Sequence, residues 1–245
     1  MRFGFKNKRF AGFACLVLLL AAAVPGRAQT AAGGESKTPS GANTLASVLA
    51  GMDRAAAQFN SVAADLEYTK VTVIVDDHST ERGEIFFDNS RGKLRVMLAF
   101  KEPSEKYVLF SGGKVSIYRP KIAEIEEYSL ANNQGLLEQF LLLGFGTSGT
   151  ELQKSYTVAV KGEETLDGEQ VVHLELVPKD GKVAARLQRI ELWLSPKSWQ
   201  PVQQKFVEPS KDYLIARYRG AQQNGKIDAK KFQFPVRGKV RTVKR

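Results

Sequence analysis

Apolar and polar residues alternate along most of the chain after residue 61, and this pattern predicts about eleven short β-strands. Segments such as "RGEIFFDN", "KLRVMLAF" and "DYLIARYRGA" are rich in β-branched and aromatic residues, and turn signals such as "LDGE" and "PKDG" separate them. No helical pattern between these segments is long enough to cross from one parallel strand to the next. We therefore expect a mainly β fold, with a single antiparallel sheet that curls into a barrel or half-barrel.

The first two elements of the folded region are expected to be a helix and a long strand. From Leu45 to Phe59, apolar residues recur with the i, i+3, i+4, i+7 spacing of one buried helical face, and Asn43 is expected to cap this helix. The segment "VAADLEYTKVTVIVDD" follows as a strand. Its alternation shifts near Thr69 and Lys70, which predicts a β-bulge there.

The stretch "LLEQFLLLGFG", residues 136–146, interrupts the strands with a nearly all-apolar helical segment. A surface helix needs only one apolar stripe, so this one must bury more than one face, or bury one face part of the time. It is either a core helix that plugs the barrel or a lid over an apolar cavity. Glycines at 135, 144, 146 and 149 would act as hinges and favour a lid, whose apolar residues would be Leu137, Phe140, Leu141 and Phe145.

The wall of such a cavity is expected on the strand "KLRVMLAF". Leu94, Val96 and Leu98 share one face of it, because successive side chains of a strand point to opposite faces. We predict that these three residues line a lipid-binding cavity together with the lid. A slip of one residue would exchange them for Arg95, Met97 and Ala99.

The N-terminus has the pattern of an export signal. Residues 1–28 combine a basic start, an apolar run of about fifteen residues and small residues near Ala28, which predicts a signal peptide cleaved after Ala28. Most of the apolar run follows Cys15, which disfavours its use as the acylated cysteine of a bacterial lipoprotein. Residues 29–42 are small and polar and are predicted to form a disordered linker, so that the folded domain spans residues 43–245.

Patterns that could support catalysis or metal binding are weak. His78 and His173 are far apart in sequence, and neither has the spacing of a metal site such as HExxH. The segment "GFGTSG" matches GxGxxG, but a helix is expected before it, where a dinucleotide-binding fingerprint needs a strand. The only cysteine lies in the signal, so the mature chain has no thiol. We predict no catalytic residue, no metal site, no cofactor and no enzymatic activity.

Basic residues gather at the C-terminal end. The signal holds five basic residues and no acid, so its cleavage lowers the net charge from +10 to +5, whereas residues 217–245 hold ten Lys or Arg against one acid. This end is either a solvated tail or a docking surface for an anionic membrane or protein, with these candidates: Arg237, Lys239, Arg241, Lys244 and Arg245. Glu124, Glu126 and Glu127 are expected to form a solvated strand face. Nucleic acid is not expected as a partner.

Four segments of the chain form a characteristic series: "RGEIFFDNSRGKLRV", "SGGKVSIYRPKIAEIEEY", the lid-like "LLEQFLLLGFG" and "NGKIDAKKFQFPVRGKVRTV". In order and spacing they resemble those of the LolA family, periplasmic carriers that ferry lipoproteins from the inner to the outer membrane. The resemblance spans residues 45–243. It implies an incomplete, half-open β-barrel closed by helices, with an apolar interior for the lipid-modified end of a cargo lipoprotein.

The resemblance also implies a location and partners. We expect a monomer in the periplasm that takes an acylated lipoprotein cargo from an inner-membrane ABC-type lipoprotein release complex. The cargo would then pass to an outer-membrane acceptor lipoprotein. No cofactor or reaction is implied.

One position departs from the family pattern. In these carriers an arginine just before a proline holds the lid shut, but here Asn89 and Ser90 stand at those positions. Arg91 and Arg95 are the nearby arginines and are candidate lid latches. Two alternatives to a carrier stay open: a binding module for a free lipid or glycolipid, and an outer-membrane acceptor of the same fold. A structural protein with a solid barrel is a third.

Overall fold

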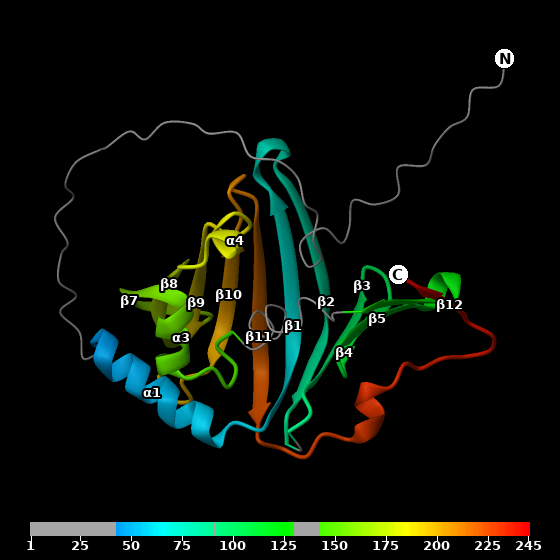
Figure 1. Cartoon of the computed structure of the whole chain (residues 1–245), viewed down its shortest axis with the longest axis horizontal. Helices are drawn as coiled ribbons and strands as arrows, with labels where there is room; N and C mark the ends of the chain where they lie inside the picture. Colours follow the sequence, from blue (N-terminus) through cyan, green and yellow to red (C-terminus); the bar gives the residue numbers. More distant parts are fainter. Residues whose placement is uncertain (1–42, 91, 130–142) are drawn as a thin grey trace. The chain divides into compact units, whose positions relative to one another are not determined.

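The computed structural model describes residues 43–90, 92–129 and 143–245. The expected signal peptide and linker, Arg91, and the lid residues Leu137, Phe140 and Leu141 lie outside these residues. The strands of the described part form one twelve-stranded sheet, in the order β12-β6-β5-β4-β3-β2-β1-β11-β10-β9-β8-β7 (Figure 1). Their bounds are β1 Ser61–Thr72, β2 Asp77–Asp88, β3 Arg95–Glu102, β4 Lys106–Ser111, β5 Lys114–Arg119, β6 Glu124–Ser129, β7 Tyr156–Leu166, β8 Glu169–Pro178, β9 Arg189–Leu194, β10 Pro201–Val207, β11 Tyr213–Gln223 and β12 Arg241–Lys244.

Short helices and 3-10 turns connect or flank these strands. They are α1 Leu45–Gln58, η1 Val73–Val75, η2 Pro120–Ile122, α3 Gly149–Ser155, α4 Gly181–Ala184 and η3 Ala229–Phe232. The predicted mainly β fold, with one open sheet and an N-terminal helix, is confirmed. The strand order ends at β12 and β7, so these two are edge strands and the sheet is not closed into a barrel.

The sheet differs from the prediction at its last strand. β12 pairs with β6 in parallel, which makes the sheet mixed and raises the number of strands to twelve. Residues 224–240 run from the end of β11, in the middle of the sheet, to the β6 edge (Figure 1). β6 and β12 are not joined by a hairpin, since β7–β11 lie between them in the chain, and strands joined by a long connection can pair in parallel.

The C-terminal end is therefore a paired strand and not a solvated tail. Glu126 of β6 is 5% exposed and accepts hydrogen bonds from Arg119 and, at 3.0 Å, from Arg245. Burial alone would raise the pKa of Glu126, but these two guanidinium groups lower it below its ordinary value. The expected solvated glutamate face is wrong at this position, because the chain end returns and covers it.

Two smaller predictions near the start of the domain are also corrected. Thr44, and not Asn43, caps α1, because its hydroxyl accepts the N–H of Ser47. β1 pairs with β2 without interruption through Thr69 and Lys70, so no bulge lies there. Residues 67–70 of β1 are partly exposed on both faces of the strand, so apolar and polar residues need not alternate there. The shift in alternation therefore does not mark a bulge.

The sheet has two faces with different cover. We call the face that carries Val96, Leu66 and Leu192 the apolar face and the opposite one the back face, following the strand register. Helices α1 and α3 cover the apolar face over β7–β10 (Figure 1). Val48 and Met52 of α1 and Leu152 of α3 are at most 1% exposed there. This packing explains the helical spacing in the N-terminal sequence.

We predict that Gly83→Ala destabilises the fold, because a Cβ on Gly83 would lie 2.1 Å from the backbone oxygen of Ala99 on the neighbouring strand. Overpacking of this kind costs about 1–3 kcal/mol, and here the obstacle is backbone, which cannot rotate away. Urea denaturation followed by circular dichroism measures the cost. Gly181→Ala is the control, since nothing lies within 4 Å of its Cβ, and an equal loss in both variants would contradict the prediction.

Acid should weaken the attachment of β12. Because the pKa of Glu126 is lowered in the folded state, its stabilising contribution is complete above its ordinary pKa and is lost as the pH falls through the folded value. We expect the stability of Glu126→Gln to depend less on pH than that of the wild type below about pH 4.5. Thermal unfolding as a function of pH measures this, and Glu127→Gln, which retains both arginine contacts of Glu126, should retain the acid sensitivity.

Candidate lipid-binding site

The predicted cavity strand has two buried faces. Val96 and Phe100 are 1% and 2% exposed and share the apolar face with the half-buried Leu98, whereas Leu94 lies just before β3. Met97 and Ala99, on the back face, are 1% and 5% exposed. Both sides of β3 are therefore apolar, as the sequence pattern allows. The two sides differ in the residues that pack against them.

On the back face of β3, the partners come from the C-terminal segment. Met97 and Ala99 belong to one buried cluster with Phe232 of η3. Phe234 also packs against this cluster. Tyr107 and Tyr118 of the neighbouring strands stack at 6.0 Å between centroids, and Phe234 lies 5.6 Å from Tyr118. This face is filled by the chain itself, so it is not the wall of a ligand site.

On the apolar face, the residues around Val96 and Leu98 form a continuous surface. Val96 lies opposite Phe87 of β2 and Phe110 of β4, and Leu98 lies opposite Ile85 and Val108. Residues in register on neighbouring strands have their side chains on the same face. The surface extends over β1–β5 and its buried members are Val62, Ala64, Leu66, Ile85, Phe87, Val96, Phe100, Val108, Phe110, Val115 and Ile117.

The last residues of the lid-like segment lie on this same face. Phe145 is 1% exposed and contacts the Tyr218 ring edge to face, with 4.8 Å between centroids. Its ring is 6.3 Å from that of Phe59, which in turn is 5.1 Å from Phe87. Because Phe87 lies opposite Val96, this series of rings connects the end of the segment with the predicted cavity strand.

Gly146 permits this close approach. Its φ is +68°, and a Cβ would lie 2.5 Å from the Phe59 ring, so a side chain is excluded both by conformation and by space. Gly144, also at positive φ, lies between the buried Leu143 and Phe145. Two of the four glycines that the sequence identified as hinges thus have backbone conformations that favour glycine.

A buried amide holds this end of the segment, and the sequence analysis did not identify it. Gln204 of β10 is 3% exposed, its Nε2 donates to the backbone oxygen of Leu143, and its Oε1 accepts the Tyr218 hydroxyl at 2.8 Å. Burial raises the pKa of Tyr218, so this hydroxyl remains a donor. The signal was present in "QPVQQKFVE", where glutamine occupies the inward position that the alternation assigns to an apolar residue.

Arg95, a candidate latch, points away from this site. It lies on the back face with Met97, its guanidinium donates to the Asp88 carboxylate, and it stands 4.2 Å from the centroid of the Phe232 ring. Burial would raise the pKa of Asp88, but hydrogen bonds from Ser90 and Arg95 lower it. These contacts connect β3 with η3. The other candidate, Arg91, lies outside the described residues.

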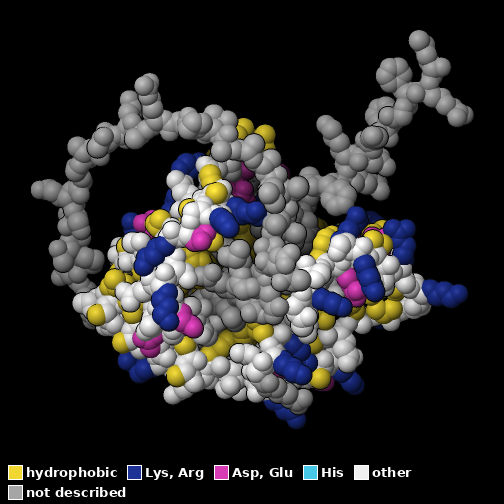
Figure 2. Space-filling view, viewed as in Figure 1, with side chains coloured by type: hydrophobic (Ala, Val, Ile, Leu, Met, Phe, Trp, Pro, Cys, Tyr) yellow, Lys and Arg dark blue, Asp and Glu magenta, His cyan; other side chains and the backbone are white. Residues whose placement is uncertain are grey.

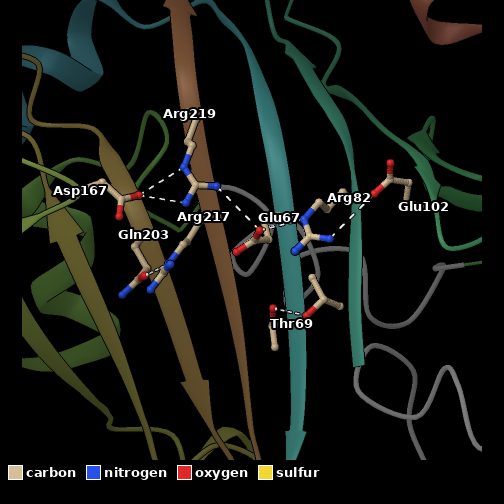
Figure 3. Close-up of polar contacts among 9 residues, drawn as sticks. Glu67, Thr69, Arg82, Glu102, Asp167, Gln203, Arg217 and Arg219 are labelled. Carbon is tan, nitrogen blue, oxygen red and sulfur yellow. Dashed lines mark hydrogen bonds and ion pairs between the residues drawn. The ribbon is translucent and has the colours of Figure 1, made fainter. Parts of the chain in front are cut away.

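The middle of the back face is polar. Arg219 donates to Asp167 at 3.0 Å and lies 3.8 Å from Glu67, which accepts from Arg82 at 3.0 Å (Figure 3). Gln203 accepts from Arg217 at 2.6 Å on the same side of the sheet (Figure 3). This partly exposed network makes the back face of the central strands polar, whereas the opposite face is apolar.

Neither a cluster of metal-binding side chains nor a membrane-spanning helix occurs in the part of the chain that the structure describes. That part has no group of three or more His, Cys, Asp or Glu placed to hold a metal ion. None of its helices has the length and hydropathy needed to cross a bilayer.

Solved structures share this fold at low sequence identity. The crystal structure of MucB is 17% identical at a TM-score of 0.52, with 83% of this chain and 67% of MucB covered. An uncharacterized conserved protein from Thermus thermophilus is 11% identical at a TM-score of 0.51, with 82% and 98% covered. A chain of the Pseudomonas aeruginosa MucA/MucB complex is 18% identical at a TM-score of 0.47, with 78% and 60% covered.

At these identities the likeness to solved structures shows the fold alone, and the chain spans about 60–67% of the length of the MucA/MucB complex chain and of MucB. No curated protein sequence matches this chain. The family model described as outer membrane lipoprotein carrier protein LolA, however, matches residues 57–235, which include every strand from β1 to β11. The chain therefore belongs to the LolA family of outer membrane lipoprotein carrier proteins.

Proposed function

We propose that this protein is a periplasmic carrier that shelters the acyl chains of lipoproteins on its apolar face and moves them from the inner to the outer membrane. The observation that carries the proposal is the continuous apolar face of β1–β5, which lies beside Phe145 in a member of the LolA family. That membership supports a carrier role for lipid or lipoprotein. The direction of transport and export by a signal peptide cleaved after Ala28 belong to the proposal.

In this proposal Val96 and Leu98, with Leu94 at the rim, contact the acyl chain, and Leu137, Phe140, Leu141 and Phe145 form the lid. The partners would be an acylated lipoprotein as cargo, an inner-membrane ABC-type release complex as donor and an outer-membrane lipoprotein as acceptor. The protein would act as a monomer, without a cofactor and without catalysis.

Burial energies favour a reversible exchange between lid and ligand. Burial of about five of the apolar side chains in residues 136–146 would contribute about 10 kcal/mol, at ~1.5–3 kcal/mol each. A sixteen-carbon acyl chain would contribute about 12 kcal/mol, at ~0.8 kcal/mol per CH₂. Because the two quantities are similar, an acyl chain can displace the lid and can be displaced in turn, as a carrier requires.

We further propose that Gln204 and Tyr218 perform the latch role that the family resemblance assigns to an arginine. Gln204 connects β10 with the backbone at Leu143, where the lid-like segment ends, and Tyr218 fixes the orientation of its amide. The hydrogen bonds of this pair lie on the apolar face itself. Those of Arg95 lie on the back face.

Identification of the ligand tests the carrier function. Native mass spectrometry of the protein purified from its own periplasm should detect a bound lipoprotein whose retention depends on its acyl groups. A free lipid or glycolipid in its place would indicate a binding module, and a protein that takes up neither would refute an acyl-binding role.

Leu98→Asn should weaken binding of an acyl chain about tenfold, because it replaces apolar contact area on the face that we assign to the ligand. Titration with a fluorescent fatty-acid probe measures the affinity. Leu109→Asn is the matched control, since Leu109 is also a half-buried leucine, lies on the adjacent strand and faces the opposite side. Equal losses of affinity in both variants would contradict the assignment of the two faces.

Gln204→Leu should speed the release of a bound acyl chain, because it removes the hydrogen bonds that hold Leu143 and Tyr218. The unpaired groups should also reduce stability by about 1–3 kcal/mol. Stopped-flow transfer of the probe to vesicles measures the release rate. Gln203→Leu is the control, because Gln203 is equally buried but pairs with Arg217 on the back face, and it should lower stability without a change in release. Unchanged release in Gln204→Leu would refute the latch.

A further inference from the structure

The hairpin between β1 and β2 ends in three exposed aliphatic residues. Val73, Ile74 and Val75 form η1 and are 46%, 86% and 68% exposed. Hydrophobic side chains at the top of the molecule, over this hairpin, are visible in Figure 2. The sequence pattern predicts a strand at these residues, in which successive side chains would point to opposite faces of the sheet.

The turn is built so that these side chains remain in solvent. Asp76 adopts φ +49° and closes the 3-10 turn with a hydrogen bond of 3.3 Å to the Val73 oxygen. On the other side, the Val73 N–H donates to Asp212 at 2.9 Å, which ties the turn to the start of β11. The conformation that presents the three aliphatic groups is therefore fixed by the fold.

This arrangement is not repeated at the other exposed aliphatic residues of the described chain. Ile122, Val177 and Val236 are 59%, 43% and 44% exposed, and each stands alone in sequence. Single exposed aliphatic side chains are common on protein surfaces, whereas a group of three at the end of a projecting hairpin is a mark of an interaction site.

The geometry of the tip identifies its partner. A 3-10 turn has three residues per turn, so the side chains of Val73, Ile74 and Val75 diverge in three directions. A rigid protein pocket would have to enclose the tip on all sides, while a fluid layer of acyl chains does so without a matched shape. We propose that this tip, which we call the aliphatic tip, inserts into the acyl region of a lipid bilayer and places the carrier on the membrane surface.

The charges beside the aliphatic tip specify the kind of membrane contact. Asp76 and Asp77 follow it directly, Asp212 contacts its backbone, and Lys70 and Lys211 are the nearby bases. With three carboxylates against two ammonium groups, the tip gains nothing from anionic headgroups. Insertion should therefore depend on apolar contact, occur with zwitterionic lipids and persist in high salt. This inference does not depend on the identity of the cargo.

Flotation with phosphatidylcholine vesicles tests the proposal on the full mature chain. The wild type should bind, and Ile74→Asp should bind about tenfold more weakly, because one aliphatic side chain no longer enters the bilayer. Ile122→Asp is the matched control, since Ile122 is also an exposed isoleucine in a 3-10 turn closed by a residue at positive φ, and its binding should equal that of the wild type. In Ile74→Trp, the emission of the new indole should shift to the blue when vesicles are added.

Several results would overturn the proposal. The proposal is wrong if the wild type does not bind the vesicles, or if Ile74→Asp binds them like the wild type. It is also wrong if binding requires phosphatidylglycerol and disappears in high salt. A dimer that Ile74→Asp dissociates in the absence of vesicles would assign the aliphatic tip to a second copy of the chain. Ile74→Asp should keep the wild-type affinity for the fatty-acid probe, so failure of the acyl cavity and failure of the aliphatic tip are separate outcomes.

Discussion

The structure depends on one constraint, which is that the apolar face extends further along the sheet than helices α1 and α3 cover. Over β7–β10 these helices supply Val48, Met52 and Leu152, and the packing there is that of an ordinary core. Over β1–β5 the face continues in register through Phe87 and Val96, and Phe59 and Phe145 lie beside it. A hydrophobic surface of this extent must be kept from water, and the proposed carrier function requires that its cover can be exchanged for an acyl chain.

The composition of the back face is the reason why the proposed ligand site is assigned to the other side of the sheet. Near β3–β5 the C-terminal segment fills it with Phe232 and Phe234, and near the middle of the sheet the ion pairs of Glu67 and Arg219 make it polar. The parallel pairing of β12 with β6 holds the end of this segment, and the buried Glu126 secures that pairing through Arg119 and Arg245. The C-terminal segment, which the sequence allowed to be a solvated tail, therefore covers part of the back face and makes it different from the apolar face.

The predictable parts of this fold are those that local periodicity determines. Alternation identified the strands, helical spacing identified α1, and the order of four segments identified the family. The assignment of the two sides of β3 could not be made, since Val96 and Met97 are equally apolar and only contacts with residues far along the chain distinguish them. The same holds for Glu126 and Gln204, because their partners Arg245 and Leu143 are distant in sequence. It also holds for Val73–Val75, because this apolar run fits a strand as well as the 3-10 turn that it forms.

The chemistry of the Gln204 contact is compatible with the lid opening that the proposed function requires. A hydrogen bond between neutral groups contributes about 0.5–1.5 kcal/mol, whereas breaking a buried ion pair by removing one partner costs about 3–5 kcal/mol. Gln204 joins the Leu143 backbone and the Tyr218 hydroxyl without any formal charge, in surroundings that are otherwise apolar. Opening at this point would expose no unpaired charge to the apolar face, and the free energy involved is small beside that of burying one acyl chain. A neutral contact therefore fixes the backbone at Leu143, and in the proposed function it would leave the balance between lid and ligand to hydrophobic burial.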